Sequence, residues 1–208
     1  MRASWPTKGD KAFVERHHGK GFTRHMTGTW YTPQHAAAFK LAAEMVLDSF
    51  EERNDYMYDD GLLFPVAYLY RHSLELKLKD LIDLGVELTV IEKSDKLIED
   101  LGGHNLAKLW NPAKSLLLDR WPTSDPTPLL AAEQVILEFH RADPNGQIFR
   151  YQTNKDGQYY RHPTLPATID LANLRTTMDG TFSFLEGCES ELTDNLQSLR
   201  DNMCGWDR

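Results

Sequence analysis

The sequence predicts an all-α protein, an antiparallel helix bundle with a short β-hairpin inserted before the last long helix. In several long segments the apolar residues recur at intervals of three and four, the spacing that gathers them on one helix face. A strand-like pattern with an Asp-Gly turn occurs only in a short stretch near residue 150. Two long antiparallel helix pairs around one core are the simplest assembly of these elements.

The N-terminal 30 residues are basic, whereas the rest of the chain is acidic. We expect residues 1–30 to form a basic arm, residues 31–200 a single helical domain, and residues 201–208 a tail. The arm has six lysines and arginines against two acidic residues, a net +4, so the whole-chain charge of −8 leaves −12 for the remainder. An acidic body disfavours broad nonspecific binding to nucleic acid. The arm could contact RNA, DNA or an acidic partner, or be a solvated terminus.

The first two predicted helices are long. Thr32-Pro33 is a good helix start, and the helix should run to about residue 53. After a polar connection at 54–61, the second helix should run from about Leu62 to Leu84, with Pro65 in its first turn and Gly85 as its stop. This second helix is apolar on almost every side, so we expect it in the middle of the bundle.

The following region contains shorter elements. Residues 86–91 could form a short strand, whereas 93–103 favour a short helix capped by Ser94. His104 and Asn105 open the next helix, and Pro112 should kink or restart it before Trp121.

The C-terminal half is predicted to contain two helices and the hairpin. One helix should cover 129–140, and the hairpin, at about 147–162, should pair 148–152 with 158–161. The last long helix should run from about residue 170 toward Leu199, with Gly180 and Gly187 as weak points.

A polar stripe in the second helix is the first candidate site. His72, Glu75 and Lys79 are three and four residues apart and share one face of an apolar helix. In a catalytic interpretation, Glu75 orients His72 for acid–base chemistry and His104 joins them. In a structural interpretation, which we favour, Glu75 pairs with Lys79 and exchanges a hydrogen bond with His104 or a helix N-terminus, fixing the packing of the helices.

The hairpin is the second candidate site. Arg150, Arg161 and His162 could form a composite ribonuclease site, with histidine as acid or base and arginine stabilising phosphorane charge. Tyr151 could stack across the strands on Tyr159 or Tyr160, and aromatic side chains beside arginines suit single-stranded nucleic acid. Tyrosine-rich hairpins are also common as plain strands or protein interfaces. Neighbouring residues such as Arg71 and His72 point about 100° apart on a helix and cannot easily act on one atom.

Several classes of site are not indicated. His17, His18 and His25 have no cysteines or carboxylates at ligand spacing, so we predict no metal site, and no cofactor motif is present. Cys188 and Cys204 do not make a disulfide framework. No stretch has the length of a membrane helix and no secretory signal is visible, so we expect a cytoplasmic protein without a membrane partner.

The segment YRHSLELKLKDLI at 70–82, followed by GHNL at 103–106, resembles the HEPN superfamily (higher eukaryotes and prokaryotes nucleotide-binding). In that family a helix of the type A-x-E-x-x-L-K-A-L-L precedes an H-D-L helix start. The resemblance covers residues 34–118 and, more loosely, the last helix. The matching positions are Glu75, Leu78, Lys79, Leu81, Ile82, His104, Asn105 and Leu106.

This resemblance implies an all-α bundle, usually dimeric, from toxin–antitoxin, antiviral defence or RNA-processing systems. Active members are metal-independent ribonucleases with an arginine followed closely by a histidine. Here no arginine has a histidine five to seven positions on, so that signature is missing.

We therefore expect a binding or accessory protein, a homodimer or a subunit of a larger complex, that acts through protein, RNA or DNA contacts. The alternatives are a ribonuclease with an unusual Arg/His site and an interaction module that docks through its arm. Besides the hairpin residues, the candidate nucleic-acid contacts are Lys8, Lys11, Arg16, Lys20 and Arg24.

Overall fold

The protein is described by a computed structural model that covers residues 8, 12, 33–52, 56–160 and 164–204. The chain divides into two compact units, Met1–Tyr31 and Thr32–Arg208, and nearly all of the first unit lies outside the described residues. The described part of the second unit is helical and contains no β-strand, which confirms the all-α prediction. Its helices are α1 (Pro33–Glu52), α2 (Tyr56–Glu87), α3 (Asp95–Gly102), α4 (Leu106–Arg120), α5 (Thr127–Ala142) and α6 (Leu171–Cys204).

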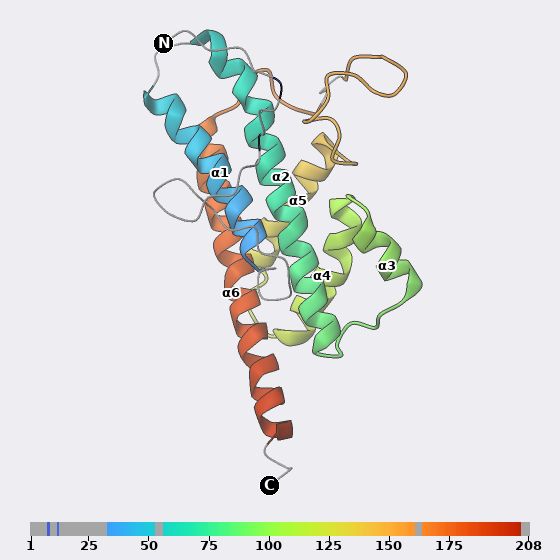
Figure 1. The fold of residues 1–208 in the computed structure, drawn as a ribbon. Coiled ribbons are helices and arrows are strands. Elements are labelled where there is room, and N and C mark those ends of the chain that lie inside the picture. Colours follow the sequence, from blue (N-terminus) through green and yellow to red (C-terminus); the bar gives the residue numbers. More distant parts are fainter. Residues whose placement is uncertain (1–7, 9–11, 13–32, 53–55, 161–163, 205–208) are drawn as a thin grey trace. The chain divides into compact units, whose positions relative to one another are not determined.

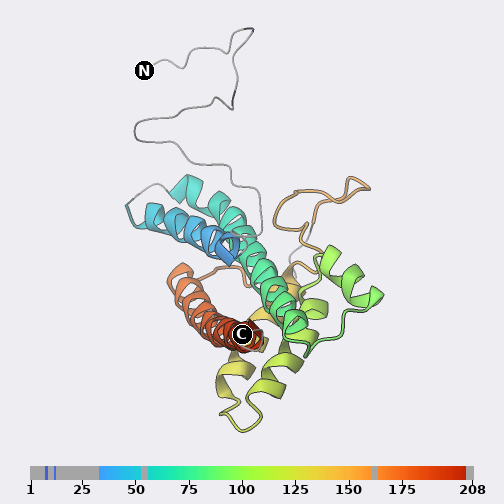
Figure 2. The same ribbon diagram turned by 60° about the horizontal axis from the view of Figure 1, so that its bottom comes forward.

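Helix α2 lies at the centre of this unit, as its composition predicts. It packs against α1, α4 and α6, while α5 packs against α4 and α6, and α3 contacts α4 (Figure 1). α1 and α2 form an antiparallel pair, but α2 and α6 run in the same direction (Figure 1). The bundle therefore contains parallel as well as antiparallel neighbours. A short connection joins α4 to α5 at one end of the bundle (Figure 2).

The core explains why α2 is central. Its Tyr70, Leu74, Leu78, Leu81 and Ile82 are completely buried and share one broad face of the helix, and Ser73 and Lys77 are buried on a neighbouring face. Burying each such side chain stabilises the fold by about 1.5–3 kcal/mol relative to leaving it exposed. The neighbouring helices contribute Leu106, Trp110, Ile136, Phe182 and Leu185 to the same core.

Helix α2 is longer than predicted at both ends. The expected polar connection is helical from Tyr56, so Pro65 lies inside the helix rather than in its first turn. Gly85 does not stop the helix, which continues to Glu87. A Cβ atom at Gly85 would lie 2.6 Å from Cδ1 of Ile91 and 2.9 Å from Cδ2 of Leu116. The glycine is therefore required by close packing of side chains on α2 rather than by a helix end.

Side-chain caps start three helices, and Ser94 among them is the cap that the sequence predicts. Ser94 Oγ accepts from Leu97 N (3.2 Å), Asn105 Oδ1 from Lys108 N (3.0 Å), and Asp170 Oδ1 from Asn173 N (2.9 Å). The alternative strand at 86–91 does not form.

The helices continue past the proline and glycines that the sequence marks as weak points. α4 runs through Pro112, and α6 runs through Gly180 and Gly187 to Cys204, which includes the first half of the predicted tail. Packing of these long helices outweighs the local cost of proline and glycine. None of the helices in the described ranges is long and apolar enough to cross a membrane.

The predicted β-hairpin does not form a pair of strands in the described residues, where a turn and one short stretch of pairing take its place. Gly157 adopts a φ of +75°, and its N–H donates to the Asn154 carbonyl (3.0 Å). Among the described residues, the pairing beyond this turn is one antiparallel bridge between Thr153 and Tyr159, next to a hydrogen bond from Tyr160 N to the Gln152 carbonyl (3.0 Å). Part of the second predicted strand, 161–163, lies outside the described residues.

The first predicted strand is replaced by a turn after α5. The carbonyl of Gln147 accepts hydrogen bonds from the N–H groups of Arg150 (3.1 Å) and Tyr151 (3.0 Å). Asp143 holds this turn, since its Oδ1 accepts from Gln147 N (2.8 Å) and Ile148 N (3.1 Å). A side-chain acceptor has thus replaced the partner strand for these backbone donors.

Candidate functional site

Glu75 is the centre of a buried ion network on α2. Its side chain is 2% exposed, and its carboxylate accepts hydrogen bonds from Arg71 Nη1 (3.1 Å) and Lys79 Nζ (2.9 Å). His104 Nδ1 lies 2.9 Å from the same carboxylate and carries the hydrogen if the carboxylate is ionised, because an ionised carboxylate only accepts. Burial alone would raise the pKa of Glu75, but the hydrogen bonds from Lys79 and His104 outweigh it and lower that pKa.

Arg71 connects this network to two other parts of the chain. The guanidinium is 1% exposed and donates through Nε to the Asp143 carbonyl (3.0 Å) and through Nη2 to the His104 carbonyl. Its Nε also lies 3.4 Å from Asp143 Oδ2. Gly146, with a φ of +69°, packs on the guanidinium, and a Cβ there would lie 2.9 Å from Nη1. Arg71 therefore joins α2, the start of α4 and the turn after α5.

The network confirms the contacts of the favoured structural interpretation. Glu75 pairs with Lys79 and bonds His104 across a helix start. Glu75 and Arg71 are buried and fully engaged with protein partners, so neither is accessible to a substrate. Among the partners of Glu75 in the described network, the ring of His104 is the most exposed, at 52%, and Lys79 is 22% exposed.

His72 does not join Glu75, although the two residues share one stripe in the sequence. Its ring stacks on Tyr68, with centroids 5.7 Å apart and an interplanar angle of 8°, and it meets the edge of Phe39 on α1 at 4.4 Å. Burial lowers the pKa of His72, which favours the neutral ring near neutral pH. The catalytic interpretation in which Glu75 orients His72 is therefore wrong in its geometry.

Arg150 extends this stack toward the surface. Its guanidinium carbon lies 5.6 Å from the Tyr68 ring centroid and 5.4 Å from that of Tyr151, and its Nε donates to the Gly146 carbonyl (2.5 Å). Tyr151 is 56% exposed and Tyr159, on the turn beyond, is 77% exposed. We call Tyr68, His72, Arg150 and Tyr151 the aromatic column.

The other predicted site contacts do not form or lie elsewhere. Among the described residues, no ring contact joins Tyr151 to Tyr159 or Tyr160. Lys8 is exposed. The described part of the chain contains no group of three or more His, Cys, Asp or Glu side chains that could hold a metal ion. The predicted site residues outside the described ranges are Lys11, Arg16, Lys20, Arg24, Arg161 and His162.

Sequence reasoning missed Tyr68, and it did not place Arg71 and Asp143 in the network. Arg71 and Glu75 have the same i,i+4 spacing as Glu75 and Lys79, which was a usable signal. Tyr68 and His72 also have that spacing, whereas Asp143 had no signal beyond membership of a turn.

The fold and site together define an all-α unit with a buried ion network and a partly exposed aromatic column. No known family model matches the chain, and comparison with curated proteins and with solved structures finds no significant match.

Proposed function

We propose that the chain is a HEPN-like binding protein, an accessory component of a bacterial defence or toxin–antitoxin system, that contacts single-stranded nucleic acid. The aromatic column is the single observation that carries this proposal. It combines a cation with stacked rings and ends in an exposed tyrosine. Every nucleobase has a face that can stack on such a ring, and arginine adds a cation–π contribution.

The charge of the chain and the exposure of its tyrosines support a local contact with nucleic acid rather than general binding. The chain carries a net charge of −8, so affinity for phosphates alone is weak and stacking has to contribute a large share. Tyr151 and Tyr159 are both exposed near the turn at 154–157, which suits unstacked bases better than a duplex.

The direct test is binding of fluorescent oligouridylate and oligothymidylate, measured by anisotropy at about 50 mM salt. Tyr151→Ala and Arg150→Ala should each weaken binding by about 5- to 100-fold, the range for losing one stacked base. Arg141→Ala removes an exposed cation from α5 and serves as the matched control, with little effect expected. Equal affinities for Tyr151→Ala and the unmodified chain would reject the column as the binding site.

A second candidate function is ribonuclease activity at His104. The observation that favours it is the carboxylate contact at Nδ1, which fixes the tautomer and leaves Nε2 for acid–base chemistry. This function predicts RNA cleavage that is lost in His104→Ala and retained in Tyr151→Ala. The binding-only proposal predicts no cleavage by any of these chains.

Homodimerisation or membership of a larger complex belongs to the same proposal. Light scattering after gel filtration gives the mass of the particle, and a single-chain mass in the presence and absence of oligonucleotide would argue against a dimer.

A further inference from the structure

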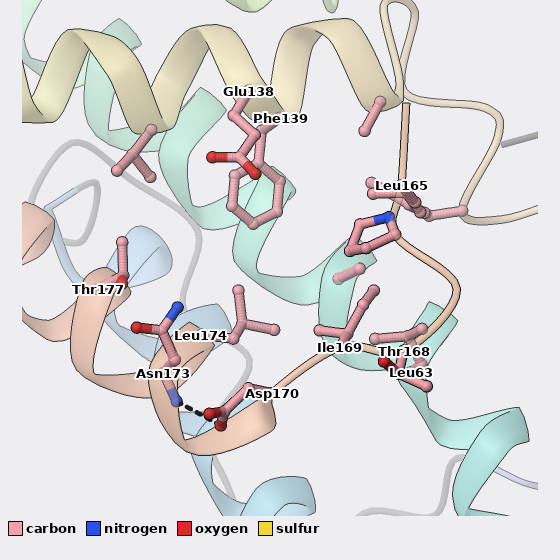
Figure 3. A pocket seen from close by; sticks show the side chains of 15 residues that line it. Leu63, Glu138, Phe139, Leu165, Thr168, Ile169, Asp170, Asn173, Leu174 and Thr177 are labelled. Atoms are coloured by element: carbon pink, nitrogen blue, oxygen red, sulfur yellow. Dashed lines mark hydrogen bonds between the residues drawn. The ribbon is translucent and has the colours of Figure 1, made fainter. Parts of the chain in front are cut away.

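A cavity of about 210 Å³ lies between α2, α5, α6 and the segment at 164–170, and none of its described lining residues belongs to the ion network (Figure 3). Most of its wall is apolar. The apolar side chains include Ala67, Phe139, Ala142, Phe149, Leu165 and Leu174. A cavity of about 150 Å³ with such walls holds a benzene ring in a well-studied engineered case. This cavity therefore has room for one ring with a short substituent.

The charged part of the wall is acidic. Glu138 comes from α5, opposite Asn173 and Thr177 on α6 (Figure 3), and its carboxylate forms no hydrogen bond or ion pair with the described residues. Asp170 also lines the cavity, with Oδ1 already accepting from Asn173 N. No lysine, arginine or histidine lies among the described lining residues.

These charges select the kind of ligand. An anion would face two carboxylates, and the α6 N-terminus that could attract it is already capped by Asp170. A cation would find the unpaired carboxylate of Glu138, and a charge-assisted hydrogen bond to it is stronger than a neutral one. The side-chain amide oxygen of Asn173 offers a further acceptor on the opposite, α6 side of the cavity.

We propose that this cavity binds a small organic cation in which one apolar ring carries a single ammonium group on a short chain. The ring packs among Ala67, Phe139 and Leu174, and the ammonium group donates to Glu138. The site is independent of the aromatic column, so it stands or fails separately from nucleic-acid binding.

The experiment uses three probes of similar size and different charge: 2-phenylethylamine, 2-phenylethanol and phenylacetate. Each is titrated into the full chain and followed by methyl and amide NMR shifts. The amine should bind about tenfold more tightly than the alcohol, the effect of one partly solvated charge-assisted hydrogen bond, and the acid should bind most weakly. The shifts should concentrate at Ala67, Ala142 and Thr177.

Two variants decide the role of the carboxylate. Glu138 is exposed, so Glu138→Gln should fold normally and bring the affinity for the amine down to that for the alcohol. Glu186→Gln changes an exposed glutamate of α6 outside the cavity and should leave the preference intact. The proposal is overturned if the three probes bind equally, or if Glu138→Gln still prefers the amine to the alcohol. It is also overturned if no probe shifts the signals of the cavity residues at about 10 mM, far above the Kd expected of a specific site.

Discussion

At the scale of single residues, the buried carboxylate of Glu75 has the largest predicted effect. Glu75→Gln removes a negative charge that faces Arg71, Lys79 and His104. The guanidinium of Arg71 would remain buried with only the Asp143 carboxylate, 3.4 Å from its Nε, as a counter-charge. Breaking a buried pair from one side costs about 3–5 kcal/mol, and the remaining counter-charge should keep the loss near the lower value, about 3 kcal/mol. We expect the free energy of unfolding, measured in urea, to fall by that amount.

Lys79, which also binds the carboxylate of Glu75, provides the control. Lys79 is only partly buried, and Lys79→Met keeps its stem while removing its charge. The Lys79 side chain is 22% exposed and Glu75 keeps Arg71 and His104 as partners, so losing this one hydrogen bond to a charged group should cost about 1.5 kcal/mol, less than Glu75→Gln. Similar losses in Glu75→Gln and Lys79→Met would show that Arg71 does not depend on Glu75.

At the scale of helices, two glycines predict opposite outcomes of the same substitution. Gly180, in α6, has open space where a Cβ would lie, so Gly180→Ala should stabilise the protein by about 0.5–1 kcal/mol through helix propensity. Gly85→Ala would press against Ile91 and Leu116 and should destabilise it by about 1–3 kcal/mol. Thermal or urea unfolding measures whether each substitution stabilises or destabilises the protein. A stabilising Gly85→Ala would contradict the close packing of α2 on these side chains.

The interface between α2 and α6 predicts a pH dependence. Lys77 Nζ pairs with Glu189 Oε2 at 2.6 Å, and Asp80 lies nearby with Oδ2 buried and without a hydrogen bond. Burial, reinforced by the charge of Glu189, raises the pKa of Asp80 to about 7. The folded state thus binds a proton that the unfolded chain releases near pH 4, so this group's contribution to stability falls as pH rises from about 4 to about 7.

Asp80→Asn should remove that dependence. We expect the substitution to stabilise the protein more at about pH 8 than at about pH 5, by about 1–2 kcal/mol, less than the full shift implies because solvent partly screens the group. Urea unfolding at the two pH values measures the difference. An equal effect of Asp80→Asn at both values would show that Asp80 is ionised throughout.

At the scale of the whole molecule, local signals predicted most of the helices. Capping side chains such as Ser94 and Asn105 act within three residues, so the sequence alone locates those starts. Helix ends and breaks depended on distant partners. Gly85 packs against Ile91 and Leu116, and Pro112 is held within a helix whose apolar face is buried. The packing of Gly85 has no local signature, which is why the predicted end of α2 was wrong.

The site was predictable where its contacts follow helical spacing. Glu75 and Lys79 are four residues apart, and the pairing with His104 followed from a motif. The aromatic column depends on the turn at 147–151, which Asp143 stabilises through backbone donors. The same residues also satisfy a strand pattern, so periodicity could not distinguish the two conformations.

Removing residues 1–31 tests how the two compact units divide stability and binding. The described buried core extends from Ala36 to Leu196, entirely within the second unit. We expect residues 32–208 to unfold in one cooperative transition, with a free energy of unfolding within about 1 kcal/mol of the full chain. Chemical denaturation of both chains, followed by circular dichroism, gives this comparison. Loss of cooperativity in the shorter chain would show that the core needs the first 31 residues.

The same truncation separates phosphate contacts from stacking. The arm carries six lysines and arginines. Affinity for a single strand falls with salt, and each contact between such a residue and a phosphate adds about 0.7 to the steepness of log affinity against log salt concentration. If the arm binds nucleic acid, the slope falls by up to about 4 in the truncated chain. The Tyr151→Ala effect should persist there, because the aromatic column lies within the second unit. A Tyr151→Ala effect that disappears with the arm would mean that stacking depends on residues 1–31 rather than acting on its own.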